Sequence, residues 1–365
     1  MTGASSVRRW SGLVVFLAVA SVGFLVAQDV VSVALWFEVV NLPLVGLLVV
    51  RPCVSGVSGV KGWVQAVWLL CAWGVVGGIA LLVGLLVLSS GSDGVSSVGV
   101  LLVLLGAGVK LSVVPLHVWL GKVHAEACTV GSVLLAGVGL KLGWVVWAGV
   151  MPVLVGSTDS SVGVWLVVVL LGSVLLSCGL LGAVDVKRWV ALYSVVHMGM
   201  LVGLSLLGVS AGILLVGMWG HSIIAGVMFL VIGLLCELSG VRRVGSLLCV
   251  SSSVPSLSIL ILLLCLANAA FPGSVLFWVE CVSGSVLCAS VPVLGFLLIV
   301  CSSMCLVSGL WVWHSISRKV RGTSLVSTSV CGVLAVSVLL LALVVRPSFV
   351  LSVLMLGCTL LSATL

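Results

Sequence analysis

Long runs of apolar residues constrain this chain more than any other feature. They are about 20 residues long, the length that an α-helix needs to cross a bilayer. They lack the alternation of apolar and polar residues that is typical of a membrane barrel. The 365 residues are 62% hydrophobic and 6% charged, which leaves too few polar residues to cover the surface of a soluble domain. The sequence therefore predicts an all-α polytopic membrane protein built as a helical bundle.

About eleven membrane-spanning segments are predicted, forming a single membrane domain over residues 1–365. No loop between them is long enough to form a separate soluble domain. The ninth segment is too long for one straight crossing and contains Ala-Phe-Pro-Gly at 270–273, so we expect a broken helix near Pro272 and a second break near Pro115. The predicted segments are 11–27, 30–50, 63–88, 95–114, 129–148, 160–183, 187–208, 211–236, 254–288, 291–316 and 325–346.

The charges of the loops predict an orientation. Eleven crossings place nearly all basic loop residues on the side of the N-terminus, while the opposite side receives Arg346 with Asp29, Asp93 and Asp159. This asymmetry follows the positive-inside rule, so the N-terminal side is expected to face the cytoplasm or the mitochondrial matrix. The basic residues on that side are Arg8, Arg9, Arg51, Lys61, Lys122, Lys187, Arg188, Arg242, Arg243, Arg318, Lys319 and Arg321.

Four ionisable residues lie inside apolar runs: Glu38, Lys110, Lys141 and Glu280. A charge at the centre of a bilayer costs at least about 2.5–3.5 kcal/mol on insertion scales. The four residues belong to four different predicted segments and carry both signs of charge. This pattern favours a proton or ion path over a role in helix packing alone.

Glu38 and Lys110 are the strongest candidates for a switch. At a separation of about 6 Å and an effective dielectric constant near 20, their attraction would be roughly 3 kcal/mol. A small helix movement that separated them would let Lys110 release its proton, and closure would favour its return.

The histidines extend this hypothesis. His197 and His221 could form a relay with Lys141 and Glu280, because imidazole titrates near neutral pH. Each histidine taken alone would more often be a packing residue. His117 and His124 flank a short interhelical loop in this prediction and are interpreted as structural.

The cysteines predict neither a disulfide framework nor a metal site. Most of the 13 cysteines lie within apolar runs, where a free thiol behaves as a small hydrophobic group. Cys301 and Cys305 are four residues apart, but no histidine or acid with metal-ligand spacing accompanies them. The chain also has no dinucleotide fingerprint and no cysteine cluster for an iron–sulfur centre, so neither a cofactor nor a redox site is expected on this chain.

Several motifs together resemble subunit 4 of NADH:ubiquinone oxidoreductase, respiratory complex I. The resemblance runs from about residue 30 to 320, and it is specific in combination although no single motif is. The matching residues are Trp36-Phe37-Glu38 with Leu42-Pro43, Leu116-His117-Val118-Trp119-Leu120, His124-Ala125-Glu126-Ala127, Gly131-Ser132, Leu140-Lys141-Leu142-Gly143, Asp185-Val186-Lys187-Arg188, Tyr193-Ser194, His197-Met198-Gly199, His221, and Pro272-Gly273 with Phe277 and Glu280.

The resemblance implies an antiporter-like fold and a role for each buried charge. Glu38 and Lys110 would be the paired acid and pumping lysine, Lys141 the central relay lysine, and Glu280 the residue facing the exit path. The implied function is proton translocation driven by electron transfer elsewhere in the complex. NADH, FMN, iron–sulfur clusters and ubiquinone would then be bound by partner subunits.

The resemblance also implies partners and a location. The expected partners are other membrane-arm subunits, especially the sister antiporter-like subunits 2 and 5, together with lipids such as cardiolipin, and no nucleic acid. The expected location is the mitochondrial inner membrane, with the N-terminus on the matrix side. The family usually has fourteen helices, so the resemblance implies that this chain lacks the first three.

Three positions depart from the family pattern, which has proline where this chain has Ser112, Gly121 and Cys128. Ser112 could straighten the break near Lys110, and the other two are expected to loosen the connecting loop. Three alternatives stay open: a subunit of a multi-subunit cation/proton antiporter, a b-type cytochrome with His197 and His221 as haem ligands, and a purely structural membrane scaffold.

Overall fold

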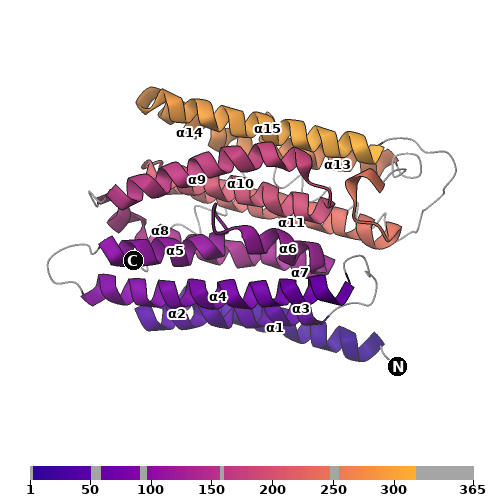
Figure 1. Cartoon of the computed structure of the whole chain (residues 1–365), viewed down its shortest axis with the longest axis horizontal. Helices are drawn as coiled ribbons and strands as arrows, with labels where there is room; N and C mark the ends of the chain where they lie inside the picture. Colours follow the sequence, from indigo (N-terminus) through magenta and orange to yellow (C-terminus); the bar gives the residue numbers. More distant parts are fainter. Residues whose placement is uncertain (1–2, 51–58, 91–96, 157–159, 247–254, 318–365) are drawn as a thin grey trace. The chain divides into compact units, whose positions relative to one another are not determined.

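The structure is a computed structural model that describes residues 3–50, 59–90, 97–156, 160–246 and 255–317. Most of these residues are helical (Figure 1). They also include one isolated β-bridge. Within them, seven helical stretches of 20 to 32 residues are long and apolar enough to cross a membrane. The all-α membrane fold is therefore confirmed. The predicted segment 325–346 and the side chains of Asp93, Asp159 and Lys319 lie outside the described residues.

The chain divides into two compact units, Met1–Val169 and Leu170–Leu365. Helix α9, Ser160–Gly179, crosses from one unit to the next. The other helices of the first unit are α1 Gly3–Val26, α2 Val30–Val39, α3 Asn41–Val49, α4 Gly59–Ser90, α5 Ser97–Leu111, α6 Val118–Glu126, α7 Thr129–Leu134, η1 Leu135–Gly139 and α8 Leu140–Gly156. Those of the second unit are η2 Leu180–Gly182, α10 Val186–Leu206, α11 Ala211–Ser239, η3 Val244–Ser246, α13 Pro255–Asn268, α14 Val275–Ser290 and α15 Pro292–Ser317.

Glycines allow α4 and α5 to lie side by side in the first unit (Figure 1). A Cβ atom at Gly106 would be 2.7 Å from both the carbonyl oxygen of Gly77 and the amide nitrogen of Leu81. Close approach of backbones at small residues is the usual way in which helices associate inside a membrane. This packing brings the end of α5 next to the middle of α4.

The predicted break near Pro115 is confirmed. Helix α5 ends at Leu111, and Ser112 adopts the left-handed region with φ 56°. The serine therefore does not straighten the break, which corrects the expectation from the sequence. Because a left-handed residue cannot continue a right-handed helix, Lys110 lies in the last turn of α5.

The segment expected to be a loop between His117 and His124 is a helix. Helix α6 covers Val118–Glu126 and includes His124, which is fully buried. This helix is stabilised by burial of the Trp119, Leu120 and Val123 side chains. The sequence prediction was wrong here because a helix this short does not have the length of a membrane crossing.

The predicted break near Pro272 is also confirmed. Helix α13 ends at Asn268 and α14 begins at Val275. Between them, Ala270 has φ 52° and Gly273 has φ 99°. Ser274 caps the new helix, because its hydroxyl oxygen accepts a hydrogen bond of 3.2 Å from the backbone N–H of Phe277. The caps and turn residues make α13 and α14 two separate helices.

Helices α10 and α11 lie in the interior of the second unit. Buried residues make up 89% of the most apolar part of α10 and 78% of that of α11, against 28% for α15. The segment that precedes α10 pairs with the segment that follows α11, through the β-bridge between Asp185 and Arg243. The backbone N–H of Val186 also donates to the carbonyl oxygen of Arg242 at 3.1 Å.

Candidate functional site

An acid, an amide and a lysine form one buried line in the first unit. The Lys110 ammonium donates a hydrogen bond to Asn41 Oδ1, and Asn41 Nδ2 donates to Glu38 Oε2 at 3.2 Å. Lys110 is 6% exposed and Asn41 is 9% exposed. The predicted pair of Glu38 and Lys110 is thus brought together, but through the side chain of Asn41. We call these three residues the Glu38–Asn41–Lys110 line.

The turn between α2 and α3 places two members of this line. Helix α2 ends at Val39 and α3 begins at Asn41, so Glu38 and Asn41 are three residues apart on either side of Val40. Residues three apart in helical geometry lie on the same face. Both side chains therefore point towards α5, where Lys110 occupies the last turn.

Glycines of α4 form the wall behind the line. A Cβ atom at Gly78 would overlap the carboxylate of Glu38, and one at Gly74 would be 3.2 Å from Asn41 Nδ2. The two glycines are four residues apart and so lie on one face of α4. A methyl group at Gly78 would occupy the place of the carboxylate, and one at Gly74 would crowd the amide.

Lys110 has two further close neighbours. Its Nζ lies 4.9 Å from the ring centroid of Phe37, a geometry in which an aromatic face attracts a cation. On α8, a Cβ atom at Gly143 would be 3.0 Å from Lys110 Cβ. The lysine thus lies in a tight space with a polar partner at its head.

Lys141 lies at the start of α8, directly after the π-helical stretch η1. Its Nζ donates a hydrogen bond of 2.8 Å to the carbonyl oxygen of Ala136 within that stretch. A π-helical turn widens the helix and changes which backbone groups are paired, and such turns are frequent at functional sites. The sequence did not predict η1.

In the second unit, His197 and His221 are neighbours. Their ring centroids are 5.2 Å apart, with His197 on α10 and His221 on α11. Tyr193, one turn before His197, stacks on its imidazole at 5.2 Å, and Trp189 lies a further turn away at 5.4 Å from Tyr193. The four rings form a continuous buried row.

Glu280 lies on α14 and is half-buried, with a polar partner on α15. The hydroxyl of Ser302 donates a hydrogen bond of 2.5 Å to Glu280 Oε2. Helix α15, which carries Ser302, also packs against α10, the helix of Tyr193 and His197. Glu280 therefore has a polar partner inside the unit.

Sequence reasoning missed Asn41, Ser302 and Tyr193 as members of these groups. Asn41 carried a usable signal, because it is one of two asparagines in the chain and follows Glu38 by three residues. Ser302 carried none, since it is one of many serines in apolar runs. Its contact with Glu280 depends on the packing of α14 against α15.

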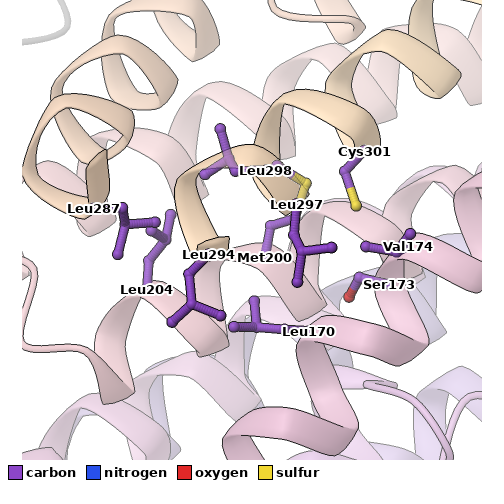
Figure 2. A pocket seen from close by; sticks show the side chains of 10 residues that line it. All are labelled: Leu170, Ser173, Val174, Met200, Leu204, Leu287, Leu294, Leu297, Leu298 and Cys301. Atoms are coloured by element: carbon purple, nitrogen blue, oxygen red, sulfur yellow. The ribbon is translucent and has the colours of Figure 1, made fainter. Parts of the chain in front are cut away.

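A pocket in the second unit has a different character (Figure 2). Its lining side chains come from α9, α10, α14 and α15 and end mostly in methyl groups. Leu170, Leu204, Leu294 and Leu298 are among them, and Ser173 supplies the one hydroxyl. Because a proton path requires groups that exchange protons, this pocket is not part of the candidate site.

The two histidines do not fit a haem between them. An axially ligated haem holds its two imidazole centroids about 6 Å or more apart, given metal–nitrogen bonds of about 2 Å on each face. The centroids of His197 and His221 are closer than this, and their planes are tilted by 45°. Among the described residues, no group of three or more His, Cys, Asp or Glu side chains could hold a metal ion.

The fold and site together define a class: a multi-pass helical membrane protein with broken helices and a buried acid–amide–lysine line. The model of the family described as "NADH:quinone oxidoreductase/Mrp antiporter, TM" matches residues 27–306. The chain belongs to this family. The matched range contains every candidate residue and both helix breaks. It confirms the resemblance inferred from the motifs.

Similar proteins carry the names of complex I subunits. The NADH-ubiquinone oxidoreductase chain 4 of Dictyostelium discoideum is 38% identical over 176 residues, which cover 46% of this chain and 32% of the relative. The NADH-quinone oxidoreductase subunit M of Rickettsia conorii is 30% identical over 171 residues, which cover 46% and 34%. The matched region therefore spans about a third of the length of these relatives.

Solved structures show the same fold. The Mrp complex from Dietzia sp. DQ12-45-1b contains a chain with a TM-score of 0.77 and 18% identity, covering 91% of this chain and 74% of that one. Respiratory complex I from Thermus thermophilus with bound NADH contains one with a TM-score of 0.75 and 21% identity, covering 95% and 78%. At these identities the likeness establishes the fold alone.

Proposed function

We propose that the chain is a proton-translocating membrane-arm subunit of a complex I-type NADH:quinone oxidoreductase. The observation that carries this proposal is the buried Glu38–Asn41–Lys110 line, which joins two groups of opposite charge through one amide. Buried ionisable groups inside membrane helices are expensive and are usually functional. The names of the relatives, chain 4 and subunit M, support the same function.

Lys110 would act as the proton carrier of the first unit. While Glu38 is ionised and close, its charge favours the ammonium form of Lys110. When a helix movement weakens this attraction, Lys110 releases its proton, and closure of the pair allows reprotonation. The helix break directly after Lys110 supports this role, because unpaired backbone groups at a break can hold the water that delivers protons.

The remaining candidates would continue the path. Lys141 would pass protons beside the carbonyl groups of η1, and His197 and His221 would exchange them across their contact in the second unit. Glu280 with Ser302 would receive them. In this proposal the direction of transfer along each unit is set by the charge states of the preceding groups.

The chemistry that drives the path would lie in partner subunits. NADH, FMN, iron–sulfur clusters and ubiquinone would be bound there, and the neighbours in the membrane arm would include the sister subunits 2 and 5 and lipids such as cardiolipin. We propose the mitochondrial inner membrane as the location, because relatives in eukaryotes carry the NADH-ubiquinone oxidoreductase name. In this proposal the N-terminus would lie on the matrix side, in agreement with the charge asymmetry of the loops.

The second candidate function is a subunit of a multi-subunit cation/proton antiporter. The fold of the Dietzia Mrp complex favours it as a runner-up. Identification of the proteins that co-purify with the chain from native membranes separates the two proposals. NADH dehydrogenase activity in the purified assembly would support complex I. Sodium- or potassium-dependent proton exchange without NADH oxidation would support the antiporter and contradict the first proposal.

Substitution of Lys110 tests the mechanism. In the assembled complex in proteoliposomes, Lys110→Ala should abolish proton uptake that depends on this subunit and slow the coupled electron transfer. Lys122→Ala is a matched control, because Lys122 lies on α6, outside the line. Unchanged pumping by Lys110→Ala, in a complex that assembles normally, would contradict the proposed function.

A further inference from the structure

We propose that Asn41 is a positioning residue that couples the charge states of Glu38 and Lys110. The inference rests on the proposed function, in which these two groups exchange protons. It goes further by assigning the control of that exchange to a side chain that cannot itself titrate. The structural basis is that one amide contacts both groups, with its oxygen on the lysine and its nitrogen on the acid.

Donor and acceptor chemistry makes this arrangement favourable for the charged pair. An ammonium group has only donors and an ionised carboxylate has only acceptors, whereas an amide presents an acceptor at one end and two donors at the other. Asn41 therefore satisfies a positive group on one side and a negative group on the other. Hydrogen bonds to charged groups are stronger than those between neutral groups, more so in a low-dielectric interior.

The surroundings hold the amide in this place. Asn41 is the first residue of α3 and is 9% exposed. Gly74 borders it on one side, because a Cβ atom at Gly74 would be 3.2 Å from Asn41 Nδ2. The carboxylate of Glu38 is placed in the same way against Gly78. The packing of α2 and α3 against α4 therefore limits the movement of both groups towards α4.

The amide also keeps the two charges from direct contact. In the described residues the carboxylate and the ammonium meet only through Asn41. A directly contacting buried pair is strongly stabilised in its charged form and is hard to separate. An intervening amide keeps the attraction while leaving Lys110 able to lose its proton. Asn41 would thus set how readily the pair opens.

The pH profile of proton transport reports this coupling. Glu38 on α2 is the acid that shares the Asn41 amide with Lys110. The other titratable side chains on helices packed against α5 are Lys61 and Cys71 on α4 and Lys141 on α8. Replacing Asn41 by leucine removes the acceptor of the ammonium, so the alkaline limb of the profile should move to lower pH. Replacing it by aspartate adds a negative charge, so the limb should move to higher pH.

The experiment compares Asn41→Leu and Asn41→Asp in the assembled complex, with NADH-driven proton uptake into proteoliposomes measured between pH 6 and pH 9. We expect a fall in uptake of about tenfold in each variant, and shifts of the alkaline limb in opposite directions, each of about one pH unit. A purely structural role of Asn41 would lower uptake without shifting the limb. An unshifted limb, or shifts in one direction, overturns the proposal.

Gly74→Ala tests the same point without removing the amide. The added methyl group should crowd Asn41 Nδ2 and lower proton uptake, whereas Gly149→Ala, at a position with no neighbouring atom within 4 Å, should not. If either Asn41 variant fails to assemble, equal uptake in the two alanine variants overturns the proposal. Lys110→Ala distinguishes failure of the proposed function from failure of the inference about Asn41. If Lys110→Ala abolishes pumping while Asn41→Leu behaves as the parent chain, only the inference about Asn41 fails.

Discussion

Gly78 of α4 faces the Glu38 carboxylate so closely that a methyl group on the glycine would overlap the Oε1 atom of the acid. Glu38 and Gly78 belong to different helices, and the contact exists only because α2 packs against α4. The glycine therefore has a role in placing a charge, in addition to its role in helix packing.

Gly78→Ala should reduce proton pumping at least tenfold while leaving most of the complex assembled. The methyl group displaces the carboxylate from Asn41 Nδ2, and a lost hydrogen bond to a charged group corresponds to about 1.5–3 kcal/mol. The measurement is proton uptake per NADH oxidised. Gly149→Ala adds the same methyl group to an open position, and a comparable loss there would indicate a general effect of alanine.

Lys110→Arg should be nearly as inactive as Lys110→Ala, although it preserves the positive charge. A guanidinium group does not release its proton at accessible pH, and its planar fork differs in shape from an ammonium group. Proton uptake across pH 6 to pH 9 measures this effect. Substantial pumping by the arginine variant would mean that Lys110 acts as a fixed charge and does not carry protons.

Glu280→Gln should lower pumping without loss of assembly. Glutamine keeps the shape of the side chain and an oxygen that can accept the hydrogen bond from Ser302, but it does not titrate. The control is Glu237→Gln on α11, an exposed acid in the same unit. Normal pumping by Glu280→Gln would remove this residue from the path.

Asp185 should make the stability of the second unit depend on pH. Its side chain accepts hydrogen bonds from the backbone N–H groups of Lys187, at 2.9 Å, and Arg188, at 3.2 Å. Burial raises the pKa of the Asp185 carboxyl above its usual 3.8, more than these bonds and the charge of Arg242 lower it. The folded chain therefore binds this proton more tightly than the unfolded chain, so its contribution to stability increases as the pH falls towards 3.8.

Two variants measured by thermal unfolding in detergent check this effect. Asp185→Asn keeps an acceptor for the first turn of α10 and removes the carboxyl, so the pH dependence just above 3.8 should become weaker. Asp185→Ala loses the cap as well and should lower the free energy of unfolding by about 1 kcal/mol at neutral pH. If the Asn variant kept the pH dependence of the parent chain, that dependence would belong to another titratable group.

The amino-acid sequence by itself determined the class of fold, the two helix breaks and the buried charges. Each of these follows from local properties. Hydropathy over about 20 residues identifies a crossing, and Pro115 and Pro272 cannot continue a helix. Glu38, Lys110, Lys141 and Glu280 stand out because their neighbours in the sequence are apolar. The short helix α6 escaped this reasoning because its apolar face covers too few residues.

Only the tertiary structure decided which side chains meet. Asn41 and Lys110 are 69 residues apart, and Glu280 and Ser302 are 22 apart. No local pattern links such positions, since their contact depends on which helix faces pack together. The same reason applies to Gly78, one of 44 glycines. Its importance depends on the Glu38 carboxylate, which lies on another helix. In an apolar chain almost any helix face can be buried, so the close packing of glycines and the few polar side chains select the arrangement.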